Sequence, residues 1–112
     1  MKIAIPTNNF ISIADDIVNS VRIKIFYIEK NCITNEEFLE SSFNNDIKET
    51  VLFLIKNSIA TIMINEINNE LEILLKENNI NVVRSKDLLI TNAITNYLKD
   101  SNLKESNYCC CP

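Results

Sequence analysis

The 112-residue chain contains no glycine and no histidine. Without glycine, it can form neither the glycine-rich dinucleotide-binding fingerprint nor a phosphate-binding loop. Without histidine, it has no imidazole to act as a general base, as a member of a catalytic triad or as a metal ligand. These absences exclude most familiar enzyme designs, so we expect a protein that is not an enzyme.

Positive charge is sparse and scattered. The formal net charge is −4, and the eleven Lys and Arg residues are not clustered. Because phosphate binding needs clustered cations, we expect no nucleic-acid partner. No apolar run approaches the ~18 residues of a membrane span, and residues 1–6 are too short an apolar start for a signal peptide. These observations favour a cytoplasmic protein without membrane attachment.

Asparagine is abundant. In a chain without glycine, Asn and Asp are the residues best able to occupy turns with positive φ. We therefore assign these asparagines first to turns or helix ends: Asn8, Asn9, Asn31, Asn44, Asn45, Asn57, Asn68, Asn69, Asn78 and Asn79.

Two apolar runs predict buried central strands. Residues 1–5 are largely apolar and stop at Pro6, which cannot donate a ladder hydrogen bond. This first strand would deliver Thr7, Asn8 and Asn9 to an open carboxyl end. Residues 59–64 form a nearly unbroken apolar run, typical of a strand covered on both faces in a parallel sheet. We expect this strand to lie beside the first.

The remaining pattern completes an α/β fold. Residues 22–28 alternate between apolar and polar side chains, and a turn at residues 30–31 leads into a polar edge strand at 32–38. Three amphipathic helices follow, with predicted N-caps at Asp46, Asn65 and Ser85 and a short strand at 81–83 before the last. The order β-β-β-α-β-α-β-α predicts a mixed five-stranded sheet with helices on its faces. We expect one domain over 1–100 and a polar, flexible, cysteine-ending tail over 101–112.

The carboxyl ends of the two central strands form the predicted binding site. If their connections leave on opposite faces of the sheet, a topological switch point opens a crevice between them. Thr7, Asn8, Asn9, Asn65 and Glu66 would line this crevice, and they are the candidate cofactor-binding residues.

Three features carry a family resemblance: the opening Met1-Lys2-Ile3-Ala4-Ile5-Pro6-Thr7-Asn8, the segment 25–28, and the helix-strand-helix order over 46–98. Together they resemble the dinitrogenase iron-molybdenum cofactor biosynthesis family. The resemblance implies a ribonuclease-H-like three-layer motif without nuclease activity, an iron-sulfur or iron-molybdenum-type cofactor and a cofactor-assembly protein as partner. The chain resembles a degenerate member, because residues 15–19, 41–45 and 65–68 replace the family's His- and Gly-containing segments, and only Thr7 and Asn8 match directly.

The candidate metal ligands are Cys109, Cys110 and Cys111, near the end of the chain. Thiolates suit Cu(I), Zn and iron-sulfur species. Adjacent cysteines lack the spacing that lets two thiolates converge on one ion, and three thiolates leave a tetrahedral site one ligand short. Cys32 could supply a fourth ligand if the tail folds back. Otherwise sharing between molecules, transient transfer, redox chemistry and a tail of no defined role all remain open.

Two functional hypotheses follow. The first is a non-enzymatic carrier of an iron-sulfur-type cluster, and the alternative is a cofactor-free protein-protein interaction module that keeps the fold. In either case we expect a monomer or a weak homodimer. An enzyme that uses Asp15, Asp16 or Glu66 is disfavoured, because nothing in the sequence places two carboxylates across a cleft.

Overall fold

A mixed five-stranded sheet with strand order β3-β2-β1-β4-β5 forms the centre of the computed structural model, which describes residues 1–41 and 43–101. The strands are β1 Lys2–Thr7, β2 Arg22–Glu29, β3 Cys32–Glu40, β4 Thr61–Ile64 and β5 Asn81–Arg84. The helices are α1 Ile47–Lys56, α2 Asn69–Glu77 and α3 Ile90–Ser101, with a short 3-10 helix η1 at Ile17–Asn19. The predicted α/β class, element order and sheet size are therefore confirmed.

The two apolar runs form the middle of the sheet, as predicted. β1 and β4 pair in parallel, with Ile3 opposite Thr61 and Ala4 opposite Ile62. β2 pairs with β1 in antiparallel orientation on the other side, and β3 follows as the edge strand. Because β1 has a hydrogen-bonded neighbour on each side and helices over both faces, all its residues after Lys2 are buried.

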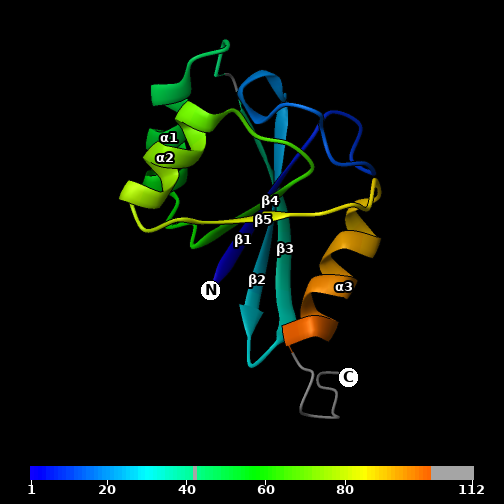
Figure 1. The fold of residues 1–112 in the computed structure, drawn as a ribbon. Coiled ribbons are helices and arrows are strands. Elements are labelled where there is room, and N and C mark those ends of the chain that lie inside the picture. The colour runs from blue at the N-terminus through cyan, green and yellow to red at the C-terminus, as the bar shows by residue number, and fades with distance from the viewer. Residues whose placement is uncertain (42, 102–112) are drawn as a thin grey trace.

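Helices cover both faces of the sheet, which gives three layers (Figure 1): α1 and α2 lie on one face and α3 on the other. The sheet residues packed toward α1 and α2 include Ala4, Ile23, Ile25, Ile62 and Ile64. Those packed toward α3 include Ile3, Ile5, Phe26, Ile28 and Met63. Since alternate residues enter different cores, a slip of one residue in register would exchange the two faces.

Helix α1 begins where the sequence predicts. The Asp46 carboxylate accepts hydrogen bonds from the backbone N–H groups of Lys48 and Glu49. These bonds satisfy two of the N–H groups that have no partner within the helix.

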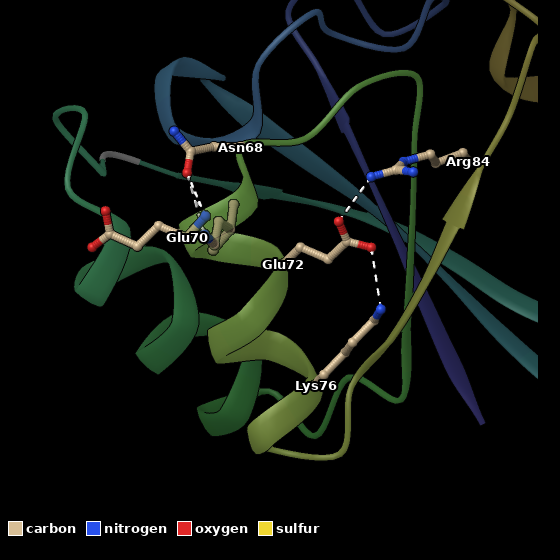
Figure 2. A network of polar contacts seen from close by, with 6 residues as sticks. Asn68, Glu70, Glu72, Lys76 and Arg84 are labelled. Carbon is tan, nitrogen blue, oxygen red and sulfur yellow. Dashed lines mark hydrogen bonds and ion pairs between the residues drawn. The ribbon is translucent and has the colours of Figure 1, made fainter.

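Helix α2 begins three residues later than predicted, because Asn68 and not Asn65 is its N-cap. Figure 2 shows the Asn68 side chain at the first turn, where its Oδ1 accepts from the backbone N–H groups of Glu70 and Leu71. One turn on, Glu72 lies between Lys76 of the same helix, at 3.4 Å, and Arg84 of β5, at 2.8 Å. The Glu72–Arg84 contact links α2 to the edge strand β5.

Helix α3 also begins later than predicted, at Ile90 and not directly after Ser85. The Ser85 hydroxyl accepts a hydrogen bond from the Asp87 backbone N–H and so closes a local turn instead of capping the helix. Within the described ranges, no helix combines the length and apolarity that a membrane crossing requires. Ser101, the first residue of the predicted tail 101–112, belongs to α3, and residues 102–112 lie outside the described residues.

Asparagine takes the place of glycine at several turns. Asn31, Asn44, Asn45 and Asn79 adopt φ between 51° and 64°, as the composition predicts. Phe10 has φ 71°. For a bulky residue this left-handed conformation is an outlier, so surrounding contacts must hold it there.

Candidate functional site

The carboxyl ends of β1 and β4 lie side by side, so the structure brings the predicted site residues to one edge of the sheet. Thr7 ends β1 and is fully buried. Its hydroxyl donates a 2.6 Å hydrogen bond to the Ser12 carbonyl. The Thr7 side chain therefore closes the loop that follows its own strand.

The two asparagines after Thr7 shape the same loop. Asn9 Oδ1 accepts hydrogen bonds from the backbone N–H groups of Ile11, at 3.0 Å, and Ser12, at 2.8 Å. Asn8 Oδ1 accepts from the Val21 N–H at 2.9 Å, where the chain enters β2. Both side-chain amides thus stabilise turns, which is the role that the composition predicts for these asparagines.

Asn65, directly after β4, binds the segment that precedes α3. Its Nδ2 donates to the carbonyl oxygens of Ser85 and Asp87, each at 2.9 Å. This use of the amide explains why Asn65 does not cap α2. The neighbouring Glu66 is exposed, and in the part of the chain that the structure describes its carboxylate makes no hydrogen bond or ion pair.

The two loops meet across the carboxyl edge. The Ile13 N–H donates to the Leu88 carbonyl at 2.8 Å, the Ile90 N–H donates to the Ile11 carbonyl at 2.9 Å, and Ser12 and Leu89 form an antiparallel bridge. The open crevice stays a prediction, and these bonds join the two loops across the carboxyl edge. The physical reason is that both loops carry unpaired backbone groups, which they satisfy on each other.

The connection after β1 crosses this edge from one face of the sheet to the other. Ile13 packs in the core below α3, whereas Ile17 of η1 packs in the core below α1 and α2. Asp16 caps η1, with one carboxylate oxygen accepting from the Val18 N–H and the other from the Asn19 side chain. The Asp16 carboxylate is thus engaged in capping a short helix.

Among the described residues, no group of three or more His, Cys, Asp or Glu side chains could hold a metal ion. The predicted metal ligands Cys109, Cys110 and Cys111 lie outside the described residues. The cofactor-binding role of Thr7, Asn8, Asn9, Asn65 and Glu66 stays a prediction, with most of their polar groups already engaged in the loops.

Sequence reasoning missed the apolar side chains exposed where the loops meet. Ile11, Leu88 and Leu89, which we call the loop patch, are 63%, 70% and 41% exposed. Only the pairing of residues 11–13 with residues 88–90 brings them together. No hydrophobic periodicity predicts this pairing, because neither segment sustains the alternation of apolar and polar residues that is typical of a strand.

Comparison with solved structures identifies the fold. The crystal structure of PH0822 has a TM-score of 0.80 at 18% identity, over 89% of this chain and 90% of that chain. The crystal structure of a proposed dinitrogenase from Methanocaldococcus jannaschii has a TM-score of 0.73 at 14% identity, over 89% of each chain. This chain shares their fold.

A proposed NifB protein from Thermotoga, of the DUF35 family, also has this fold, with a TM-score of 0.69 at 17% identity over 86% of this chain and 85% of that chain. No family model matches the chain, and no curated protein matches it. The resemblance to the dinitrogenase iron-molybdenum cofactor biosynthesis family is thus confirmed at the level of the three-layer α/β fold, at low sequence identity.

Proposed function

We propose that the protein is a non-enzymatic accessory protein that carries an iron-sulfur or iron-molybdenum-type cluster as cargo and passes it to a cofactor-assembly protein. The observation that carries the proposal is the shared fold with a proposed dinitrogenase and a proposed NifB protein. The thiol triplet Cys109, Cys110 and Cys111 supports it, because thiolates are the ligands that such clusters prefer.

In this proposal the folded body and the thiols have separate tasks. The described residues offer no ligand set, so the cargo would be held by the thiolates alone. Three thiolates leave a tetrahedral iron one ligand short, and the missing ligand would come from the recipient or from a second molecule. An incomplete ligand set favours transfer of the cluster to a recipient over its permanent storage. Because such a transfer is an exchange of ligands, the proposed carrier needs no catalytic residue.

Anaerobic reconstitution tests the carrier proposal. The full chain is incubated with iron and sulfide, desalted, and analysed for iron, for acid-labile sulfide and by absorbance spectroscopy. We expect stoichiometric iron on the native chain and its loss in the variant in which Cys109, Cys110 and Cys111 are all changed to Ser. Equal iron content in the triple variant and the native chain would refute the proposal.

The second candidate is an interaction module that works without a cofactor. The exposed loop patch favours it, since its three apolar side chains are exposed on two segments joined by backbone hydrogen bonds, and exposed apolar patches mark interaction sites. Immobilised protein and its Leu88→Ser variant would be compared for capture of an identified cofactor-assembly protein. Ile73→Ser is the matched control, because Ile73 is similarly exposed on the outer side of α2. Equal capture by all three would argue against the loop patch as the contact.

A further inference from the structure

The face of the sheet below α3 is covered by one helix, whereas the opposite face is covered by two (Figure 1). On this less covered face, a cavity of about 270 Å³ lies between α3 and the β2–β3 hairpin. Its apolar walls include Phe10, Phe26, Ile33, Ile90 and Ile94. The volume is just below the range of about 300–1,000 Å³ typical of ligand pockets, so the cavity suits a small molecule.

A lysine and a glutamate form one polar side of this cavity. Lys24 Nζ lies 2.8 Å from Glu36 Oε1 and 4.2 Å from the centroid of the Phe38 ring. The Lys24 side chain is only 13% exposed, so its charge is largely withdrawn from water and already paired. Lys24 and Glu36 therefore leave little net charge at this side.

Arg22 supplies a second cation close by, and its charge is not paired. Its Cζ lies 4.2 Å from the centroid of the Phe10 ring, and within residues 1–41 and 43–101 it makes no ion pair. Glu40 is opposite Arg22 in the β2–β3 register and so shares its face of the sheet, but among the described residues the two form no ion pair. The guanidinium is thus held in place by stacking while its N–H groups remain available for a carboxylate.

Phe10 contacts the Arg22 guanidinium and also lines the cavity. One face of its ring carries the Arg22 guanidinium, and the ring meets Phe38 in an edge-to-face contact at 4.9 Å. The same side chain is part of the cavity wall. These contacts hold Phe10 in its left-handed backbone conformation. Arg22 does not itself line the cavity, so a ligand would reach its guanidinium by extending past the Phe10 ring.

We propose that this cavity binds a small carboxylic acid with an apolar body, either aromatic or branched aliphatic. The apolar body occupies the space between Phe26 and the Ile90–Ile94 turn of α3, and the carboxylate accepts paired hydrogen bonds from Arg22. Planar, two-point recognition of a carboxylate is what an arginine side chain provides and a lysine does not. This site lies on the α3 face and is independent of the thiol triplet in the carrier proposal.

Titration of the isotope-labelled full chain with phenylacetate, followed by heteronuclear NMR, tests this site. We expect saturable shifts at amides of β2, β3 and residues 90–95. Phenylacetamide, which has the same body without the charge, should bind at least about tenfold more weakly, since a charge-assisted hydrogen bond is lost. Equal affinity for the acid and the amide would overturn the proposal, as would the absence of saturable shifts.

Three variants locate the ligand. Arg22→Gln should weaken phenylacetate binding at least about tenfold, and Arg22→Lys should restore it only in part. Thr91→Trp should abolish binding, because Thr91 is an exposed residue that lines the cavity and the indole would fill it. Asn92→Trp, at the adjacent exposed position, is the matched control and should bind normally. Unchanged binding by Thr91→Trp, or binding of an acidic peptide but not of phenylacetate, would refute the assignment.

Discussion

Tyr27 donates its hydroxyl hydrogen to the Glu37 carboxylate across the β2–β3 pair. This hydrogen bond, followed by partial burial and by the negative charge of Glu37, raises the pKa of Tyr27 above its ordinary value of 10.0. Glu37→Gln removes the charge and weakens the acceptor, so we expect the pKa of Tyr27 to fall back toward 10. Tyrosinate absorbance during an alkaline titration measures the change, with Tyr27→Phe used to subtract the other tyrosines.

Because of the same hydrogen bond, the stability of the folded protein should decrease at alkaline pH. Because the folded-state pKa is the higher one, the contribution of the hydrogen bond is fully present below about pH 10 and is lost as the pH rises through the folded-state pKa. The native chain should therefore lose stability relative to Glu37→Gln above pH 10. A constant difference between the two proteins across that pH range would contradict the assignment.

The Asn65 side-chain amide holds the segment before α3 at the carboxyl edge of the sheet. Its Nδ2 donates to two carbonyl oxygens of the segment before α3. Asn65→Ala should lower the free energy of unfolding by about 1–3 kcal/mol, because two hydrogen bonds to partly buried carbonyl oxygens are lost. Asn65→Asp should cost more at neutral pH, since a carboxylate would face the same carbonyl oxygens. Urea denaturation measures both, and an Asn65→Asp protein as stable as the native chain would contradict this role.

At the scale of elements, helix α1 depends on its cap. The Asp46 carboxylate accepts from two backbone N–H groups of the first turn. Asp46→Ala should destabilise the protein by about 0.5–2 kcal/mol, whereas Asp46→Asn keeps the acceptor and should cost less. Chemical denaturation monitored by circular dichroism gives both values. Equal losses in the two variants would show that the cap acts through its charge and not through its hydrogen bonds.

Local chemistry explains which elements the sequence predicts correctly. The apolar runs around Ile3 and Met63 need cover on both faces, so they become central parallel strands. Asp46 has no competing partner and caps its helix, as expected. Asn65 and Ser85 look equally suited to capping, but each finds another partner in a loop, and both helices begin later. A capping residue is thus predictable only where no other group competes for its side chain.

The binding site was harder to predict, because it depends on contacts between distant loops. Thr7, Asn8 and Asn9 occupy the expected edge, and residues 88–90 join residues 11–13 across that edge through backbone hydrogen bonds. Backbone groups carry no sequence signature, so this pairing is not visible in side-chain patterns. For the same reason, the sequence contains no sign that Phe10 and Phe38 meet beside a cavity.

At the scale of the whole molecule, stability should be highest in the two central strands. β1 and β4 have a hydrogen-bonded strand on both sides and helices over both faces, whereas β3 has no strand on its outer side among the described residues. Amides of β1 and β4 should therefore exchange with deuterium only on global unfolding, and outward-directed amides of β3 should exchange through local opening. Exchange measured by NMR on the intact chain gives the order in which the amides lose protection.

The inward-directed amides of β3, which bond to β2, are the internal control, because they share the strand but not its outer edge. Equal protection of β1 and the outer amides of β3 would mean that the sheet opens as one unit, and the central pair would not then be the stable centre of this fold.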